Sequence, residues 1–518
     1  MKKEAENPLD PPEHNDAKDL VEGALANFLG MAAKISKVLF IFVAAHMYGP
    51  TALGVYLLAW SAIDIASKFG LWGIDRSLIR DIARYNIDNS EATKARIFGI
   101  LRFNLSIALC LSLLAAAVMF NLSTVIAERV FKEASLIFPL KILSLTLPFV
   151  VLTHALIATT KALRIMRYEV LIRQGLEPLV LLIAAVSMSP LNLGATGLVI
   201  AHMIGSIVAA GCAAIVVFHK YSFLGWHRVP LAREIKMETI RYTSPMAAMD
   251  SLNLLVARID IMLIGYFLNV TSAGYYGIAV EIISVIKRVR QGFEPIFSPM
   301  VSEHFYNKKK AQLKRNYIIV TRWLMAGTLL PTLAIALYPT PILLLFSEKA
   351  TEAATALIIL AISHGLFGTF SAAESLLVMT GKSLLNTLLA AGMLVINCAI
   401  SIPLIPEFGL AGAALGILAA FSFAGAARIY YAYKHYKLHP FGRALIWPLL
   451  TASITLVLFY TLNNWLLINS LLETILIFMC LLVFYVGFYF IGAREPEERY
   501  LIERLKNKLK RTPVVSGT

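Results

Sequence analysis

Five charged residues stand within one apolar stretch of the sequence, AGYYGIAVEIISVIKRVRQGFEPIFSP at residues 273–299. They are Glu281, Lys287, Arg288, Arg290 and Glu294. At 100° per residue, the charged and polar side chains fall on one half of a helix and the aliphatic side chains on the other half. Arg290 and Glu294 are spaced i,i+4 and can pair. The pattern predicts a helix with one face toward lipid or protein and the other toward a wet, charged cavity.

Three further apolar stretches, at about 24–46, 52–74 and 243–267, also carry charges that share helical faces. One of their acids and one of their lysines, Asp64 and Lys68, are spaced for an i,i+4 pair, whereas Arg258 lies off the acidic face of its helix. The cationic candidates for a binding site are Lys34, Lys37, Lys68, Arg258, Lys287, Arg288 and Arg290. The candidates for carrying a coupled ion or proton are Asp64, Asp250, Asp260 and Glu281.

Basic residues outnumber acidic ones in these four stretches. Each charge at bilayer depth costs roughly 2.5–3.5 kcal/mol, so random placement toward lipid is disfavoured. A surplus of cations in a cavity predicts an anionic guest such as a phosphate or pyrophosphate, which arginine binds in a bidentate manner. The alternative is structural ion pairing between the halves of the protein.

The composition of the whole chain places these stretches in a membrane. The 518 residues are 58% hydrophobic and 15% charged, with a mean hydropathy of +0.71, whereas soluble domains are about 25% charged. A spanning helix needs about 20 mostly apolar residues. Fourteen runs meet that length, and the sequence therefore predicts an all-α polytopic membrane protein. The runs are 24–46, 52–74, 97–120, 137–160, 169–189, 194–218, 243–267, 273–297, 317–338, 353–379, 383–403, 409–432, 444–463 and 471–492.

The distribution of basic residues predicts the orientation. With both ends in the cytoplasm, the inside loops and the tail hold most of the lysines and arginines, whereas the outside loops hold Arg129, Lys132 and Lys349. This agrees with the positive-inside rule. It also accounts for the net charge of +15 through contact with anionic lipid, without nucleic acid. Residues 1–20 are expected to be a disordered cytoplasmic arm, and residues 493–518 a basic amphipathic tail on the membrane surface.

No catalytic, metal or nucleotide motif is recognisable. The cysteines Cys110, Cys212, Cys398 and Cys480 stand singly in apolar runs, which indicates small core residues. The fragment Thr380–Ser383 ends like a phosphate-binding loop, but the glycine that such a loop requires is replaced by Leu376. We therefore expect neither an enzyme nor an ATP-driven protein, and no cofactor or metal.

The two halves of the chain repeat short motifs in the same order and at a nearly constant offset. Gly54-Val-Tyr56 in the first half is matched by Gly274-Tyr-Tyr276 in the second, and Leu193-Gly194 is matched by Phe408-Gly409. Each half has six runs that enter and leave on one side, which is typical of a transporter built from parallel repeats. We expect an N-lobe at 21–220, a cytoplasmic loop at 221–242, a C-lobe at 243–433 and two additional helices at 444–492.

The stretch AAHMYGPTALGVYLLAWSAIDIASKFGLWGIDRSLIRDIA at 44–83 resembles bacterial oligosaccharide flippases. These belong to the multidrug/oligosaccharidyl-lipid/polysaccharide exporter superfamily. The resemblance rests on Gly49-Pro50, on the Gly-x-Tyr of 54–56 and on the ending Gly73-Ile-Asp-Arg-Ser-Leu-Ile-Arg80. It extends over the chain from about residue 20, and it is specific to the superfamily more than to one branch.

This resemblance implies two six-helix lobes in a V-shaped bundle in a bacterial inner membrane. It implies a flippase that moves a polyprenyl-pyrophosphate-linked sugar repeat unit outward for O-antigen, capsule or exopolysaccharide synthesis. Alternating access through a cationic cavity would be driven by an ion gradient or the membrane potential. A polysaccharide polymerase and other assembly proteins would be partners, together with membrane lipid. The alternatives are a peptidoglycan lipid II flippase, a multidrug/cation antiporter of the same superfamily, and a membrane scaffold without transport.

Overall fold

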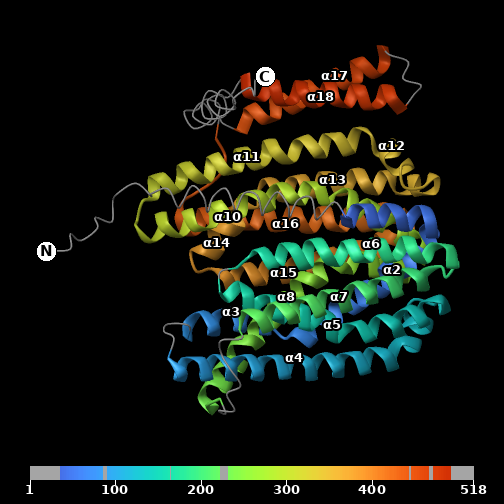
Figure 1. Ribbon diagram of the computed structural model, residues 1–518. Coiled ribbons are helices and arrows are strands. Elements are labelled where there is room, and N and C mark those ends of the chain that lie inside the picture. The colour runs from blue at the N-terminus through green and yellow to red at the C-terminus, as the bar shows by residue number, and fades with distance from the viewer. Residues whose placement is uncertain are drawn as a thin grey trace, which may run out of the picture. The chain divides into compact units, whose positions relative to one another are not determined.

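The computed structural model describes residues 36–85, 90–163, 165–221, 231–442, 445–465 and 471–491 (Figure 1). The predicted arm at 1–20, the tail at 493–518 and Lys34 lie outside these ranges. Within them every regular element is a helix. The α-helices after residues 36–43 are α2 (Gly49–Leu71), α3 (Ile74–Tyr85), α4 (Glu91–Val125), α5 (Ile137–Ala162), α6 (Glu177–Met188), α7 (Ala195–Lys220), α8 (Arg233–Phe267), α9 (Val270–Ile282), α10 (Ser284–Tyr306), α11 (Lys310–Leu337), α12 (Pro339–Leu344), α13 (Ala354–Thr369), α14 (Ala372–Met379), α15 (Ser383–Phe408), α16 (Leu410–Tyr436), α17 (Ile446–Trp465) and α18 (Leu471–Ile491).

The predicted all-helical membrane fold is confirmed, since helices occupy the described part of every predicted run. Nine helical segments of the described residues are long and apolar enough to cross a membrane, and shorter apolar helices follow near the C-terminal end. Large apolar side chains such as Leu114, Ile215 and Leu384 are more than 60% exposed along these helices. Such a surface fits lipid and not water. The chain is a multi-pass membrane protein.

Several predicted runs are interrupted. The second run, predicted at 52–74, ends in α2 at Leu71, and α3 follows it directly after Trp72 and Gly73, both of which have positive φ. Gly73 also has no room for a side chain, because a Cβ there would lie 2.8 Å from the carbonyl oxygen of Thr243. The charged run that opened the sequence analysis divides at Ile283, between α9 and α10. A periodicity count does not detect such breaks, because they preserve the apolar composition.

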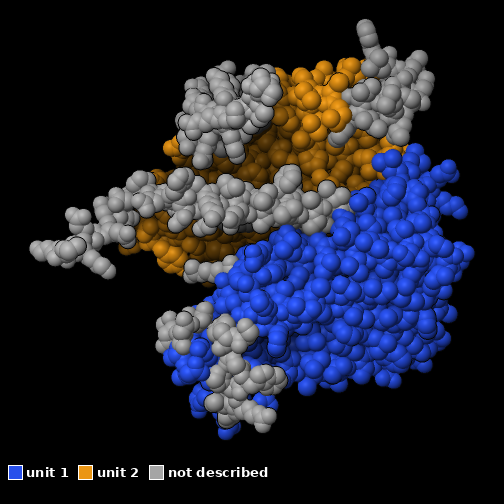
Figure 2. Space-filling model, viewed as in Figure 1, with its two compact units in different colours: residues 1–281, 343–353, 401–413 blue, residues 282–342, 354–400, 414–518 orange. Residues whose placement is uncertain are grey.

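The helices form two compact units (Figure 2). Unit 1 comprises residues 1–281, 343–353 and 401–413, and unit 2 comprises residues 282–342, 354–400 and 414–518. In unit 1, α5 packs against α2, α3, α4 and α7 around a buried aliphatic core. In unit 2, α10 and α11 pack with α14 around Phe297, Tyr317 and Leu376. The units divide the chain differently from the expected lobes, since α8 and α9 pack within unit 1; the lobe boundaries stay a prediction.

One contact in unit 1 joins positions that the repeat makes equivalent. The hydroxyls of Thr51 and Thr271, which are 220 positions apart, lie 2.9 Å from each other. A Cβ added at Gly54 would lie 1.7 Å from the carbonyl oxygen of Val270, and one added at Gly274 would lie 2.2 Å from that of Pro50. Each of these glycine contacts is the counterpart of the other at the same offset. The start of α2 and the start of α9 therefore cross on a local two-fold axis.

The crossing of α2 and α9 predicts that a single methyl group added at Gly54 strongly lowers the stability of the protein. Gly54→Ala places Cβ against backbone, which cannot move aside as a flexible side chain could. We expect a destabilisation at or above the upper end of the roughly 1–3 kcal/mol that overpacking costs. The measurement is the thermal midpoint and monodisperse yield of the detergent-purified protein.

Gly211→Ala is the matched control, because nothing lies within 4 Å of a Cβ at that helical position. It should be neutral or stabilise the protein by up to about 1 kcal/mol. A Gly54→Ala protein as stable as the Gly211→Ala protein would contradict the tight crossing.

Candidate functional site: charged clusters in the two units

In unit 1, Asp64 of α2 pairs with Arg258 of α8. The Nε and Nη2 atoms of Arg258 both donate to Asp64 Oδ2, at 3.1 and 2.8 Å. The pairing with Lys68 that the spacing suggested is not formed, and Lys68 makes no ion pair with a described carboxylate. A guanidinium reaching across from another helix provides two aligned donors, which an ammonium one turn away does not.

Asp250 of α8 is held even more firmly by Arg76 of α3. Arg76 donates through Nε at 3.0 Å and through Nη2 at 2.6 Å, one bond to each carboxylate oxygen. Farther along the same two helices, Asp81 accepts from the Ser77 and Thr239 hydroxyls at 2.8 and 3.1 Å. Bonds of this bidentate kind fix geometry as well as charge. The α3–α8 contact is thus fastened by polar groups along its length.

The remaining acidic candidates of unit 1 are buried. Glu281 is 7% exposed and pairs with Lys37, whose Nζ lies 3.3 Å from Glu281 Oε2. Asp260 is 4% exposed and also has an interaction partner. All four predicted ion-coupling acids are therefore engaged by other groups in this conformation.

In unit 2, the three basic candidates Lys287, Arg288 and Arg290 lie half-buried on α10. Lys287 and Arg288 have interaction partners. Arg290 lies 3.8 Å from Glu294, as the i,i+4 spacing predicted, but its shorter contact is with Glu374 of α14 at 2.9 Å. The residue nearest in sequence is therefore not its main partner.

A second arginine shares that carboxylate. Arg428 of α16 is 3% exposed, and its Nη1 lies 3.2 Å from Glu374 Oε2. Its Nε donates to Asn386 Oδ1 at 3.0 Å. The guanidinium carbons of Arg290 and Arg428 each lie 5.3 Å from the centre of the Phe367 ring. Two cations thus share one carboxylate and one aromatic ring, which disperses their charge inside the unit.

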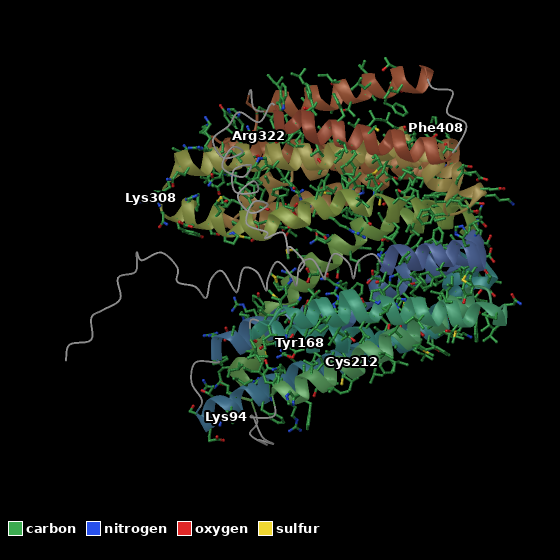
Figure 3. All side chains as sticks on the ribbon, turned by 45° about the horizontal axis from the view of Figure 1, so that its top comes forward. Lys94, Tyr168, Cys212, Lys308, Arg322 and Phe408 are labelled. Atoms are coloured by element: carbon green, nitrogen blue, oxygen red, sulfur yellow. The ribbon has the colours of Figure 1, made fainter. Side chains whose placement is uncertain are left out.

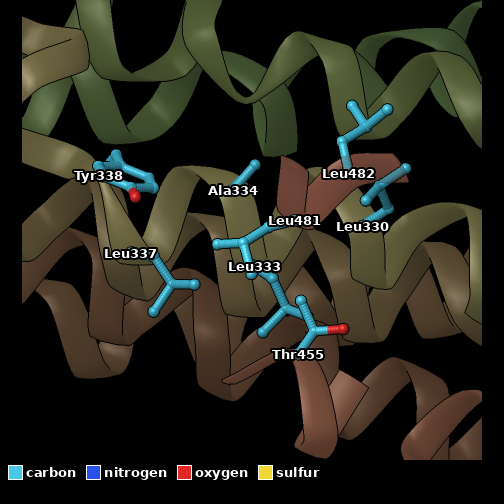
Figure 4. Close-up of a pocket in the computed structure, with 8 residues that line it drawn as sticks. All are labelled: Leu330, Leu333, Ala334, Leu337, Tyr338, Thr455, Leu481 and Leu482. Atoms are coloured by element: carbon cyan, nitrogen blue, oxygen red, sulfur yellow. The ribbon is translucent and has the colours of Figure 1, made fainter. Parts of the chain in front are cut away.

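A small pocket adjoins this cluster. Arg290, Glu294 and the residues Ser371 and Ser375 give it polar walls. A second small pocket of unit 2 is lined by apolar side chains together with Thr455 and Tyr338. It lies between α11 and the helices α17 and α18 (Figure 4). Of these two pockets, the one beside Arg290 combines a cation with hydroxyl groups.

Basic side chains of unit 2 differ in their environment along the helices. Lys308 lies at the turn between α10 and α11, whereas Arg322 lies farther along α11 (Figure 3) and is 4% exposed. Arg322 has interaction partners.

The sequence analysis did not select Arg76 or Arg428 as site residues. Arg76 belongs to the motif at 73–80, and a single arginine inside the run at 409–432 was the available signal for Arg428.

The chain shares its fold with solved structures of membrane transporters. It is similar to the solved structure described as "Lipid II flippase MurJ, inward closed conformation", at 14% identity and a TM-score of 0.74, covering 92% of this chain and 100% of that one. It is similar to an inward-facing multidrug resistance MATE family transporter of the MOP superfamily, at 14% identity and a TM-score of 0.65, covering 78% and 94%. A third is a structure of the MATE multidrug transporter DinF-BH, at 15% identity and a TM-score of 0.58, covering 83% and 98%. The chain therefore has the fold of these three structures.

Comparison at the level of sequence identifies the family within that architecture. Residues 43–355 match the family described as "Polysaccharide biosynthesis protein". The chain therefore belongs to the polysaccharide biosynthesis protein family, in agreement with the resemblance noted at residues 44–83. A search of curated proteins returned no match.

The shared carboxylate of unit 2 generates a prediction about stability. Glu374→Leu leaves the buried guanidinium of Arg428 and the half-buried one of Arg290 without their common counter-charge, which should cost about 3–5 kcal/mol. Adding Arg428→Leu removes one of the two cations and should recover part of that loss. Thermal midpoints of Glu374→Leu, Arg428→Leu, the double variant and the wild type measure the coupling.

The exposed pair of Glu91 and Lys94, 2.8 Å apart, provides the control. Glu91→Ala should cost less than about 0.5 kcal/mol, because surface i,i+3 pairs contribute little. Strictly additive losses for Glu374→Leu and Arg428→Leu would contradict the shared-carboxylate arrangement.

Proposed function

We propose that this protein flips a polyprenyl-pyrophosphate-linked oligosaccharide repeat unit across the bacterial cytoplasmic membrane for surface polysaccharide synthesis. The observation that supports this best is the match of residues 43–355 to the polysaccharide biosynthesis family in a chain with the MOP fold. The family takes part in polysaccharide biosynthesis, and the fold is found in transporters. Transport of a lipid-linked glycan combines these two properties. The O-antigen, capsule or exopolysaccharide unit is the substrate class, with membrane lipid and the glycan polymerase as partners.

The chemistry of the substrate fits the charged helices. A lipid pyrophosphate presents several oxygen acceptors on one anion, and guanidinium groups bind such acceptors bidentately. Lys34, Lys37, Lys68, Arg258, Lys287, Arg288 and Arg290 are the basic residues that we assign to this role. Because Lys37, Arg258 and Arg290 already have carboxylate partners, binding is an exchange of one anion for another and not a filling of empty positions. Such exchange allows release as well as binding.

The energy for outward movement comes from an ion gradient or the membrane potential. Movement of one elementary charge through 100 mV yields about 2.3 kcal/mol, so a few charges per cycle suffice. Asp64, Asp250, Asp260 and Glu281 are the acids proposed for ion coupling. Access would alternate between the two sides as the two repeats rock, with both chain ends in the cytoplasm.

A second candidate is transport of peptidoglycan lipid II. The specific observation is the similarity to a solved lipid II flippase over all of that chain. Both substrates share the polyprenyl-pyrophosphate anchor, and they differ in the sugar. Loss of surface polysaccharide with intact cell-wall synthesis in a deletion strain favours the first candidate, and the reverse favours the second.

Arg288 gives the sharpest test of the binding role. Arg288→Ala in a strain that depends on this gene should lower surface polysaccharide at least tenfold at normal membrane abundance, while lipid-linked repeat units accumulate inside. Arg288→Lys keeps the charge and loses the bidentate geometry, so it separates those two contributions. Surface glycan and lipid-linked intermediates are the quantities measured.

Lys314→Ala is the matched control, since Lys314 is exposed near the start of α11. It should export normally. Normal export by Arg288→Ala and Arg288→Lys as well would contradict a role for Arg288 in binding the lipid-linked anion.

A further inference from the structure

His202 lies in an unusual environment in unit 1. It is on α7, it is 7% exposed, and its Nδ1 lies 2.8 Å from the hydroxyl of Tyr56. The indole of Trp60 lies against the imidazole, with ring centres 4.0 Å apart. The other ring nitrogen, Nε2, is buried and has no hydrogen-bond partner among the described residues. A buried polar atom without a partner is costly, so it requires an explanation.

The repeat shows that the fold does not require this histidine. Tyr276 is the counterpart of Tyr56 in the repeated glycine–tyrosine motif, and Ile417 is the counterpart of His202 at the offset that relates Gly194 to Gly409. The Tyr276 side chain is fully buried, and its hydroxyl has no hydrogen-bond partner within the described chain. The second half thus keeps the tyrosine and has an aliphatic residue where the first half has an imidazole. Packing alone does not account for His202.

Glu177 lies near the same level of α7. A Cβ added at Gly205, one turn after His202, would lie 3.2 Å from the Glu177 carbonyl oxygen. Glu177 makes no ion pair with any described residue, whereas Asp64 pairs with Arg258 and Glu281 pairs with Lys37. His202 and Glu177 are therefore two titratable groups of this region that form no ion pair in the described part of unit 1, as His154 of α5 and Lys68 of α2 also form none.

The charged and titratable neighbours come from several elements. Asp64 and Arg258 are the charged groups whose fields act on His202, and Asp64 and Arg173 are those that act on Glu177. The elements packed against α7 carry these groups in their membrane-spanning parts: Tyr56, Asp64 and Lys68 on α2, Lys141, His154 and Lys161 on α5, Glu169 and Arg173 on η4 (Glu169–Leu176), and Glu177 on α6. Asp64 and Arg258 form an ion pair with no net charge. This pair therefore neither strongly attracts nor strongly repels a proton that arrives at His202 or Glu177.

We infer that His202 and Glu177 form a proton-binding site in unit 1 that couples a proton gradient to the transport cycle. The inference rests on the proposed transport function and identifies residues outside its set of acids. One proton binds the imidazole and no electrons move; both ring nitrogens of the imidazolium then carry hydrogen, and Nδ1 donates to the Tyr56 oxygen. The Glu177 carboxylate takes up a proton to become a carboxylic acid, which later releases it. Tyr56 and Trp60 are positioning residues that hold the imidazole.

The test measures proton movement directly, without a glycolipid. Purified full-length protein is reconstituted in vesicles loaded with pyranine, and a potassium/valinomycin potential is imposed. The wild type should move protons, and His202→Gln and Glu177→Gln should lower the initial rate at least tenfold. Tyr56→Phe, which keeps the ring and removes the hydroxyl, should shift the pH at which the rate is half-maximal. A merely structural role would leave that pH unchanged.

His219→Gln on the exposed end of α7 and Glu407→Gln at an exposed position are the matched controls. Both should conduct like the wild type. Monodisperse elution of every variant is required, and Glu177→Gln and Tyr56→Phe keep the test decisive where His202→Gln fails to fold.

The outcomes separate this site from the proposed function. Unchanged proton rates in His202→Gln and Glu177→Gln, or no proton movement by a wild type that restores surface glycan in cells, overturn the site and leave the glycan function standing. Proton movement that depends on these residues, in a protein that restores no glycan, supports the site and overturns the assigned cargo.

Discussion

The crossing of α2 and α9 constrains the structure of unit 1 more than any single ion pair does. Gly54 and Gly274 each bring a helix start against the backbone of the other helix, at distances that no side chain would permit. Because this contact relates equivalent positions of the two repeats, it places their starts in register. The pairs Asp64–Arg258 and Arg76–Asp250 then follow along α2, α3 and α8. These ion pairs stabilise the packing of α2 and α3 against α8, and the close approach of α2 to α9 depends on the two glycines.

Much of the fold was predictable because hydrophobic length and periodicity carry the information. The runs, the repeat and the importance of Gly54 and Gly274 all follow from the printed sequence. The breaks at Trp72 and Ile283 do not, because they depend on how helices from distant parts of the chain approach each other. Gly73 shows this directly, since its crowding comes from Thr243, far away in sequence.

Candidate site residues were easier to select than to pair. Every predicted site residue in the described ranges lies on a helix, but sequence spacing names only partners one turn away. It suggested Lys68 for Asp64, where the structure has Arg258, and it assigned to Arg290 only its weaker partner, Glu294. Arg428 and Glu374 come from α16 and α14 and meet Arg290 of α10, so no local pattern reports their contact. Three of the cationic candidates, Lys37, Arg258 and Arg290, are paired with carboxylates, and a substrate anion has to compete with those carboxylates at these positions.

The repeat preserves the backbone and differs in its chemistry. At the offset that relates Gly54 to Gly274, Arg290 and Glu374 of the second half correspond to Gly70 and His154 of the first, and at the offset of the later motif Arg428 corresponds to Ala213. The arginine cluster is thus peculiar to the second half, as the imidazole of His202 is peculiar to the first. Two halves with the same fold but different buried polar groups can divide two tasks between them. A cation-rich half suits an anion, and a half that holds the unpaired carboxyl of Glu177 and the buried imidazole of His202 suits a proton. The crossing at Gly54 and Gly274 joins the two halves backbone to backbone, and the pairs Asp64–Arg258 and Arg76–Asp250 join them through side chains.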